Sequence, residues 1–525
     1  MGAATGSDGA GTSAIVVAAL SDPATYPDGP DTVTVHETHG SWVFVAGPRA
    51  YKVKKPVVLA FLDYGTLERR RAMCREELRL NRRLAPELYL GTVALVRRGD
   101  GFALDDDDAT PDALEVAVAM ARFDEADTLA SRIGAGCASA ADARAVGVRL
   151  AAFHAATPAH ADPTAVATLR TAIRGTLDDL EADGADPHAI AALRSLMEAF
   201  LSARRKELDA RARAGRVRDG HGDLRAEHVL LTDPLQVVDA IEFDPGLRVI
   251  DVAADLAFLA MDLEGLGAAD LAGELVDAYR GAGGDPGDDA LLAAMACYRA
   301  LVRAKVDLVR SGQGAAAARE RAGQRIALAR RFAWRARGPL VLAVCGPPAS
   351  GKSTLAAAIA ADSGRRALSS DLVRKELVGI APTERAGAGA YDAATTRATY
   401  RELGRRAAQT LATAGGVIVD ATLGDHAMRD ALREGLGSAG APLVFVECRA
   451  PAALLDRRAG ERERNPGRVS DAGPEIARDL RARWQPLDEV PANDHVALRT
   501  DRPVGDALVT LWRELDLRLA SGPRR

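Results

Sequence analysis

The chain has 525 residues, of which 48% are hydrophobic and 27% charged, and its formal net charge is −5. This length exceeds one ordinary hydrophobic core, so it excludes a single small binding module and predicts two or more domains. The composition is typical of a soluble globular protein, and the lack of a basic excess argues against a nucleic-acid backbone as partner.

The cysteines and the N-terminal segment indicate the compartment. Five cysteines are scattered along the chain without a CxxC pair, so neither a disulfide framework nor a structural zinc site is predicted. Residues 1–13 are rich in Gly, Ala and Ser, which predicts a disordered tail, and they lack the basic and apolar regions of a targeting signal. We therefore predict a cytoplasmic protein without a membrane partner and leave its oligomeric state open.

The first part of the chain predicts a strand-rich lobe followed by a helical lobe. Its predicted elements are a hairpin of two strands within 41–56, a helix at 67–84, a further strand at 115–123, and helix-rich segments at 140–208 and 268–334. Together these elements predict an α+β domain over residues 14–335.

The second part predicts an α/β domain. Its predicted elements are an apolar strand at 339–345, a helix at 354–361, and buried-type strands at 417–420 and 443–446 with helical stretches between them. This alternation is typical of a parallel sheet. We place the domain boundary near residue 336, which gives a second domain over residues 336–525.

A phosphate-binding motif directly follows the strand at 339–345. The GxxxxGKS pattern consists of Gly346, Pro347, Pro348, Ala349, Ser350, Gly351, Lys352 and Ser353, with Thr354 next in the chain. Glycines let backbone N–H groups surround a β-phosphate at a helix N-terminus, Lys352 reaches the β- and γ-oxygens, and the Ser353 hydroxyl coordinates Mg²⁺. The motif predicts that this domain binds ATP or another nucleoside triphosphate together with Mg²⁺.

An acidic residue nineteen positions beyond Lys352 points to a kinase. Asp371 and Arg374 fall on one face if a helix starts here, although Asp371 could also be a plain helix N-cap. The spacing resembles the P-loop small kinases typified by the polynucleotide 5′-kinase domain, the zeta-toxin kinases and gluconate-kinase relatives. This resemblance implies that Asp371 is the general base on an acceptor hydroxyl and that Arg374 places acceptor or phosphate.

Two further features of the same domain fit this resemblance. Asp420 ends an apolar strand, where a carboxylate would hold the Mg²⁺ shell, but an acid after a strand is also a common turn residue. A cluster of arginines resembles the mobile lid that neutralises charge on the transferred phosphoryl group, and its alternative is a solvated basic helix face. The cluster consists of Arg457, Arg458, Arg462 and Arg464.

A second phosphotransfer signature lies in the first part of the chain. The string His221-Gly222-Asp223-Leu224 precedes apolar strands, the second of which ends at Asp239. It resembles the catalytic and metal-binding loops of the aminoglycoside phosphotransferase and choline-kinase-like group of the protein-kinase fold. The resemblance implies that Asp223 orients or deprotonates the acceptor hydroxyl and that Asp239 binds metal.

The resemblance extends upstream to a lysine and a glutamate. Lys52, in an Ala-x-Lys string, matches the lysine that contacts the α- and β-phosphates, and Lys54 on the same strand face is the alternative. Glu77 on the following helix matches its ion-pair partner, with Glu76 as the fallback. Residues 116–120 would lead to the hinge that holds adenine.

One position departs from that family's pattern. His228 stands where the family has an Asn that binds a second Mg²⁺, and imidazole is a poorer ligand for this hard ion than an oxygen donor. The site could bind ATP with one metal, use Glu242 or Asp244 instead, or be a pseudokinase.

The pairing of the two parts resembles the bacterial bifunctional aminoglycoside phosphotransferase-like/ATP-binding proteins. It implies an ATP- and Mg²⁺-dependent kinase with two nucleotide sites, acting on a hydroxyl of a small molecule such as a sugar, aminoglycoside-like compound, nucleoside or nucleotide. Asp262 and Glu264 could form an acidic acceptor pocket or lie on the surface. The alternatives are a regulatory first domain with only the P-loop domain active, and a P-loop ATPase without a phosphorylated acceptor.

Overall fold

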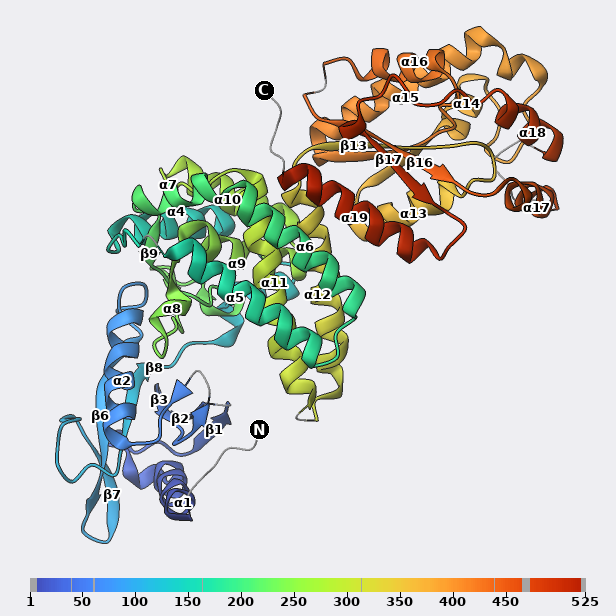
Figure 1. The fold of residues 1–525 in the computed structure, drawn as a ribbon. Coiled ribbons are helices and arrows are strands. Elements are labelled where there is room, and N and C mark those ends of the chain that lie inside the picture. Colours follow the sequence, from blue (N-terminus) through green and yellow to red (C-terminus); the bar gives the residue numbers. More distant parts are fainter. Residues whose placement is uncertain are drawn as a thin grey trace. The chain divides into compact units, whose positions relative to one another are not determined.

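The computed structural model describes residues 7–38, 40–59, 62–162, 164–312, 314–438, 440–464 and 473–520 (Figure 1). The chain forms two compact units: the first comprises Met1–Ala165 and Leu208–Gly287, and the second comprises Val166–Glu207 and Asp288–Arg525.

A six-stranded antiparallel sheet forms the strand-rich part of the first unit, with strand order β1-β2-β3-β8-β6-β7. The strands are β1 (Val33–Glu37), β2 (Ser41–Ala46), β3 (Arg49–Lys54), β6 (Tyr89–Arg98), β7 (Gly101–Asp105) and β8 (Glu115–Ala121). Because side chains alternate along β3, Tyr51 and Val53 pack under helix α1 (Ser7–Ser21), whereas Lys52 and Lys54 lie on the face of helix α2 (Leu67–Asn81). The predicted hairpin is confirmed by the pairing of β2 with β3.

Helix α1 overlaps the segment for which a disordered tail is expected. The helix begins at Ser7, so residues 7–13 are helical in this structure, and residues 1–6 lie outside the described part. Val16, Ala19 and Leu20 of this helix are buried against the sheet, which explains why it is ordered there.

The helical part of the first unit surrounds short strands that carry the His221 loop. Its helices are α3 (Leu129–Gly134), α4 (Ala140–Ala156), α7 (Arg205–Arg213), α8 (Pro245–Arg248), α9 (Val252–Gly265) and α10 (Ala269–Gly281). The short strands are β9 (Val217–Asp219), β10 (Val229–Leu230), β11 (Gln236–Val237) and β12 (Val249–Asp251), and the 3-10 turns are η2 (Glu125–Asp127) and η3 (Ala226–His228). The strand-rich part also contains the short strands β4 (Val58–Leu59) and β5 (Leu62–Asp63) and the 3-10 turn η1 (Pro23–Thr25). This α+β arrangement agrees with the predicted kinase-like lobes.

A five-stranded parallel sheet lies at the centre of the second unit, with strand order β14-β15-β13-β16-β17. The strands are β13 (Leu340–Cys345), β14 (Arg366–Ser369), β15 (Gly416–Asp420), β16 (Leu443–Arg449) and β17 (His495–Arg499). The helices are α13 (Lys352–Ser363), α14 (Ser370–Leu377), α15 (Ala393–Ala414), α16 (His426–Leu436), α17 (Ala452–Glu463), α18 (Pro474–Ala482) and α19 (Val504–Ala520), with 3-10 turns η4 (Ala388–Tyr391) and η5 (Ala492–Asp494). The predicted α/β class with a parallel sheet is confirmed.

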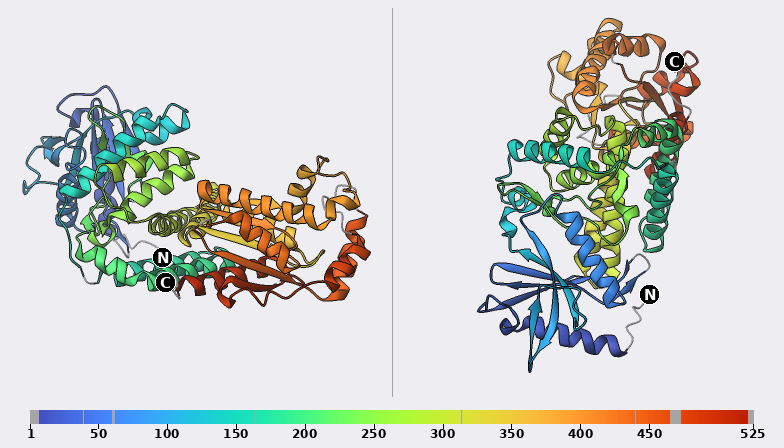
Figure 2. Two further views of the ribbon diagram at one scale, coloured as in Figure 1. Left: turned by 90° about the horizontal axis from the view of Figure 1, so that it is seen from above. Right: turned by 90° about the vertical axis from the view of Figure 1, so that its left-hand side faces the viewer.

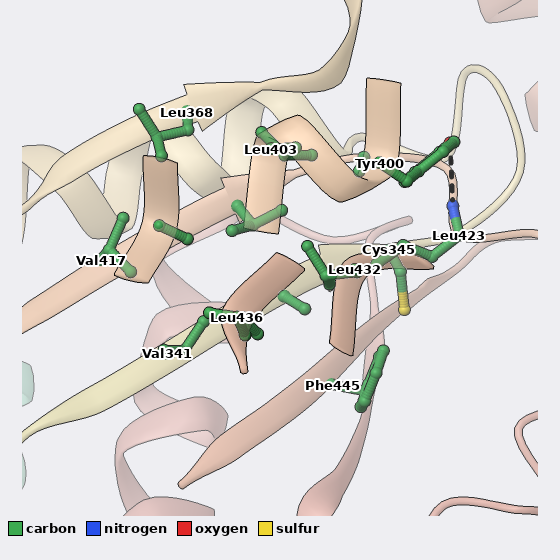
Figure 3. Packing of buried hydrophobic residues seen from close by; sticks show 14 of the residues in the cluster. Val341, Cys345, Leu368, Tyr400, Leu403, Val417, Leu423, Leu432, Leu436 and Phe445 are labelled. Carbon is green, nitrogen blue, oxygen red and sulfur yellow. Dashed lines mark hydrogen bonds between the residues drawn. The ribbon is translucent and has the colours of Figure 1, made fainter. Parts of the chain in front are cut away.

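Helices cover both faces of the parallel sheet, which is why β13 consists of buried residues throughout. Figure 2 (left) shows the sheet between α15 on one side and α19 on the other. On the α15 and α16 face, Leu403 and Leu432 pack over Val417 and Phe445, and the Tyr400 hydroxyl accepts the Leu423 N–H at 3.4 Å (Figure 3). This core fixes the strand ends that carry the P-loop.

Four further helices belong to the second unit, although they precede the predicted boundary at 336. They are α5 (Ala165–Ala182), α6 (Pro187–Ala203), α11 (Asp289–Gly312) and α12 (Ala316–Ala336). Helix α12 contacts α13, and α6 contacts α19. The boundary at 336 stays a prediction for independently folding domains, and the compact units divide the chain differently. Among the described residues, no helix combines the length and apolarity needed to cross a membrane.

A buried carboxylate joins α12 to α13 and α19. Asp362 accepts the indole N–H of Trp334 at 2.8 Å and that of Trp512 at 3.0 Å, and it pairs with Arg330 at 2.6 Å. We expect Asp362→Ala to lower the free energy of unfolding by about 3–5 kcal/mol, because it leaves a largely buried guanidinium and two indole donors without this acceptor.

Urea unfolding followed by tryptophan fluorescence measures this loss. Asp430→Ala is the control, since Asp430 is an exposed acid that pairs with nearby Arg433, and its loss is expected to change the free energy of unfolding by no more than about 0.5 kcal/mol. Equal unfolding curves for the two variants would show that the Asp362 contacts do not stabilise the joint.

Candidate functional site

The P-loop of the second unit connects β13 to α13 and has a backbone that only certain residues tolerate. Gly346 and Gly351 have φ angles of 141° and 90°. A Cβ on Gly346 would lie 2.7 Å from the carbonyl oxygen of Cys448 and 2.8 Å from the Ser350 Oγ. These contacts are too short for any side chain, so the loop needs glycine at the first position of the motif.

The first turn of α13 presents the groups that the motif predicts. Lys352 Nζ donates a hydrogen bond to the Pro347 carbonyl oxygen at 3.0 Å, which places the ammonium within the loop. Ser353 and Thr354 are exposed, whereas the Ser350 Oγ is buried and has no hydrogen-bond partner among the described residues. Unpaired N–H groups and the helix dipole at such an N-terminus favour phosphate.

The strand register brings two acidic residues to the same edge of the sheet. Asp420 at the end of β15 is level with Val344 of β13 and with Ser369 of β14. Asp371 lies two residues beyond Ser369, in the first turn of α14. The carboxyl ends of three neighbouring parallel strands therefore carry the P-loop, Asp420 and Asp371, the edge at which open α/β sheets bind ligands.

The oxygen donors at this edge fit Mg²⁺. The hydroxyl of Ser353 and the carboxylate of Asp420 are hard ligands, and Mg²⁺ is commonly held by one or two such groups together with phosphates and water. Within the described ranges, no cluster of three or more His, Cys, Asp or Glu side chains could hold an ion by itself. Two oxygen donors beside the P-loop suit an ion that is also held by phosphate oxygens.

Asp371 is not a helix N-cap, so the alternative interpretation of this residue is wrong. The N-cap of α14 is Ser369, and Asp371 is the second residue inside the helix. Arg374, one turn later, is buried, and its Nη1 donates to the Ala390 carbonyl at 2.6 Å and to the Thr396 hydroxyl at 3.2 Å. Its guanidinium thus anchors the segment around Ala390.

The predicted lid arginines differ in their surroundings. Arg458 Nη2 donates to the Thr500 carbonyl at 2.8 Å, and the Thr500 hydroxyl donates to the Ser350 carbonyl at 2.6 Å, so this arginine is linked to the P-loop. Arg457 is exposed and lies near Glu461, and Arg464 contacts the Gly460 carbonyl. The side chain of Arg462 lies outside the described part of the chain.

Sequence reasoning missed two residues that shape this site. Thr500 follows β17, and only its place at the carboxyl end of a strand could have indicated it. Arg429 of α16 is completely buried, donates to the carbonyls of Leu423, Gln485 and Pro486, and pairs with Glu489. It joins the loop after β15 to the segment after α18, but in the sequence it resembles an ordinary surface arginine of an amphipathic helix.

In the first unit, both candidate lysines contact the same glutamate. Lys52 Nζ lies 2.8 Å from Glu77 and 2.6 Å from Asp239, and Lys54 pairs with Glu77 and Glu242. Burial disfavours the Glu77 carboxylate, but the two lysines outweigh it and lower the pKa of Glu77. Lys52 likewise holds the pKa of Asp239 well below its usual range. The geometry favours Lys52 for a phosphate contact, because it alone of the two also contacts Asp239.

The fallback residues at this site have other partners. Glu76 pairs with Arg79 and Arg248 and not with either lysine. Glu242 is held by Lys54 and by the Tyr64 hydroxyl at 2.6 Å, and Asp244 accepts the Gly246 N–H at 2.8 Å as the N-cap of α8. Neither acid is therefore arranged to replace the family's asparagine as a metal ligand.

Carboxylates of α9 hold the His221 loop in place. Asp255 accepts the backbone N–H groups of His221 at 2.7 Å and Gly222 at 3.0 Å. Asp262 accepts the N–H of Ala226 at 3.0 Å, so it also supports the loop. Helix α9 thus holds the loop that carries Asp223 in place.

The completely buried His221 gives the first unit a pH dependence. Its Nε2–H donates to the Val238 carbonyl at 2.9 Å, and its Nδ1 accepts the Asp223 N–H at 3.3 Å, so the neutral ring satisfies both contacts. Burial lowers the pKa of His221 from its usual value near 6.5 to about 4. The unfolded chain therefore binds a proton between these values that the folded chain excludes.

We expect stability to fall as the pH is lowered through this range. Lowering the pH from about 7.5 to about 5 should reduce the free energy of unfolding by about 2 kcal/mol through this histidine. Urea unfolding of the wild type and of His221→Asn at both pH values measures the difference, since asparagine does not titrate. Identical pH dependence of the two proteins would contradict the assignment.

His228 lies between the two predicted acidic residues of the first site. Its Nδ1 is 2.8 Å from the Asp223 carbonyl oxygen, and its Nε2 is 3.7 Å from the Asp239 carboxylate and 2.9 Å from Arg225. Asp223 itself pairs with Arg225 at 2.9 Å. The predicted catalytic and metal-binding residues are thus brought together, with Arg225, which the sequence did not single out, among them.

Comparison with known proteins gives one family model, several similar structures and relatives that span most of the chain. Residues 341–487 match the family model described as an AAA domain. The structure is similar to a gluconokinase from Sinorhizobium meliloti 1021, with 22% identity, a TM-score of 0.25 and coverage of 35% of this chain and 94% of that one. It is also similar to a choline/ethanolamine kinase family protein from Mesorhizobium loti, with 15% identity, a TM-score of 0.39 and coverage of 61% of this chain and 94% of that one.

The chain joins a region built on an antiparallel sheet to a P-loop domain built on a parallel sheet. It is 34% identical over 492 residues, which are 92% of this chain and 95% of the relative, to the uncharacterized protein Mb2027c of Mycobacterium bovis (strain ATCC BAA-935 / AF2122/97). The same values hold for the uncharacterized protein Rv2004c of Mycobacterium tuberculosis (strain ATCC 25618 / H37Rv). The chain belongs to the family of these mycobacterial proteins.

Proposed function

We propose that the protein is an ATP- and Mg²⁺-dependent phosphotransferase that acts on a hydroxyl group of a small molecule and has two nucleotide sites. The observation that carries this proposal is the carboxyl edge of the parallel sheet, where the P-loop, Asp420 and Asp371 meet. In this arrangement the P-loop binds the nucleotide. Asp371 is a carboxylate outside the loop and can activate an acceptor hydroxyl.

Each residue at this edge has a proposed part in the transfer. Lys352 contacts the β- and γ-phosphate oxygens, and Ser353 and Asp420 hold the Mg²⁺ ion. Asp371 accepts the proton of the attacking hydroxyl, and Arg374 keeps the acceptor side of the site in shape. Arg458, already linked to the P-loop through Thr500, neutralises charge on the transferred group, aided by Arg457, Arg462 and Arg464.

The first unit supplies the second proposed nucleotide site. Lys52 contacts the α- and β-phosphates, Glu77 orients this lysine, Asp239 holds a metal ion, and Asp223 orients the acceptor hydroxyl. The cluster of Lys52, Glu77 and Asp239 supports this assignment. The cysteines of the chain are free, which supports a reducing compartment such as the cytoplasm.

A second candidate function is a regulatory or binding role for the first unit, with only the P-loop domain turning over. Two observations favour it. The carboxylate of Asp223 is paired with Arg225, which opposes its use as a base, and an imidazole stands at the position of a metal-binding amide. In this case the first unit still binds nucleotide but transfers nothing.

A search for the acceptor tests the proposal. The protein is incubated with ATP, Mg²⁺ and a metabolite extract, and mass spectrometry identifies newly phosphorylated compounds with the wild type, Lys352→Ala and Asp223→Ala. A product that disappears with Lys352→Ala supports the P-loop kinase, and one that disappears with Asp223→Ala supports a catalytic first unit. ATP hydrolysis without any new phosphorylated compound would contradict the proposal.

A further inference from the structure

Arg225 occupies the centre of the proposed nucleotide site of the first unit. Its Nε and Nη2 donate to Asp223 Oδ2 at 3.0 and 2.9 Å, and the same Nη2 lies 2.9 Å from His228 Nε2. Nη1 pairs with Glu227. The side chain of Arg225 is only 13% exposed, so this guanidinium belongs to the interior of the site and not to the protein surface.

The two nitrogens of His228 are both engaged. Nδ1 lies 2.8 Å from the Asp223 carbonyl oxygen, which can only accept, so Nδ1 carries the hydrogen. Nε2 therefore has its lone pair free of hydrogen and directs it at the guanidinium of Arg225, which can only donate. The nitrogen that would have to ligate a metal is thus used as an acceptor for a cation.

These residues do not fit a second divalent ion. Such an ion would have to bind between His228 and Asp239, within a few ångströms of the Arg225 guanidinium, and two positive groups at that separation repel strongly in a partly buried site. The ion would also have to displace Arg225 from Nε2. Asp239, by contrast, has a side chain that is 46% exposed and is held by Lys52 from one side, which leaves it accessible to one ion.

We propose that the guanidinium of Arg225 takes the place of the second metal ion, so that the first unit binds a nucleotide with a single divalent ion at Asp239. This inference rests on the proposed nucleotide site of that unit. Lys52 and Arg225 then supply fixed positive charge near the phosphates. Arg225 acts through its charge, because its nitrogens already contact Asp223, Glu227 and His228. His228 is a positioning residue that holds Arg225.

Counting bound Mn²⁺ tests the inference without measuring activity. The full chain carrying Lys352→Ala, which disables the P-loop, is titrated with Mn²⁺ and a non-hydrolysable ATP analogue, and electron paramagnetic resonance counts the bound ions. The same measurement on a chain that carries both Lys352→Ala and Lys52→Ala gives the number of Mn²⁺ ions bound elsewhere, which is subtracted. We expect one Mn²⁺ per first-unit site, and two after Arg225→Ala combined with His228→Asn.

A binding measurement adds a second readout. Arg225→Ala alone should weaken binding of the analogue about tenfold, because a positive charge close to the phosphates is lost. Arg98→Ala, an exposed arginine at the end of β6, is the matched control and should change nothing. Circular dichroism checks that each variant is folded.

Different results would contradict the single-metal inference and the proposed nucleotide site of the first unit. Two Mn²⁺ ions per first-unit site would overturn the single-metal inference if Arg225 and His228 are both unchanged. This measurement does not depend on whether the Arg225 and His228 variants fold. Unchanged affinity in Arg225→Ala would also overturn it. Absence of any analogue binding that depends on Lys52 would instead remove the nucleotide site of the first unit altogether.

Discussion

Lys352→Ala is expected to lower phosphoryl transfer by the second unit about 100- to 1000-fold, because loss of one preorganised donor from a developing charge has a cost of that size. The ammonium group already lies within the loop, where it donates to the Pro347 carbonyl. Its removal leaves the γ-phosphate without the positive charge that the loop supplies. ATP consumption in a chain that also carries Asp223→Ala, so that the first unit does not contribute, measures the loss in the presence of Mg²⁺ and a metabolite extract.

Lys305→Ala is the matched control for this substitution. Lys305 lies on α11 of the same unit, is partly exposed and pairs with Asp179 of α5. Its replacement should leave ATP consumption unchanged. If Lys352→Ala consumed ATP as fast as Lys305→Ala, the P-loop would not be the site of turnover.

Asp371→Asn is expected to lower transfer to the acceptor about 100- to 10,000-fold, the range of a lost general base. Asparagine keeps the size of the side chain and its place in the first turn of α14, so nucleotide binding should be preserved. The prediction separates a kinase from a P-loop ATPase, because an ATPase without a phosphorylated acceptor does not need this carboxylate. Formation of the phosphorylated product and binding of ATP are measured on the same preparation.

Glu376→Gln provides the same chemical change on the same helix. Glu376 is exposed and pairs with Arg406, so its amide should retain full activity. Full activity in Asp371→Asn as well would favour the ATPase and end the assignment of Asp371 as the base.

The P-loop could be predicted because its requirements are local. A backbone that turns from β13 into α13 needs glycine at Gly346, where a Cβ would collide with a neighbouring carbonyl, and the sequence shows that glycine directly. The strand before it and the helix after it are also encoded in adjacent residues. The carboxylate of Asp420 could be expected at this edge because it ends a predicted strand, whereas β14, the strand before Asp371, was not predicted.

The choice between Lys52 and Lys54 could not be made from the sequence. Both lie on the same face of β3, and both contact Glu77 in the structure. Only the contact with Asp239, a residue 187 positions away, distinguishes Lys52. Sequence periodicity indicates which face a side chain occupies, but not which distant residue meets it there.

Buried arginines were the least predictable part of the site. Arg225 and Arg429 look like surface residues in the sequence, yet Arg225 pairs with Asp223 and Arg429 joins two loops. For the same reason the helices around Trp334 were expected in the first domain, since their amphipathic pattern does not reveal that Asp362 and Trp512 pack against them.

The number of nucleotides bound per chain tests the account most directly. Equilibrium dialysis with a non-hydrolysable ATP analogue and Mg²⁺ should give two analogue molecules per wild-type chain, one in Lys352→Ala, one in Lys52→Ala and none in the double variant. A single bound analogue that is lost with Lys352→Ala and unaffected by Lys52→Ala would contradict the two-site account.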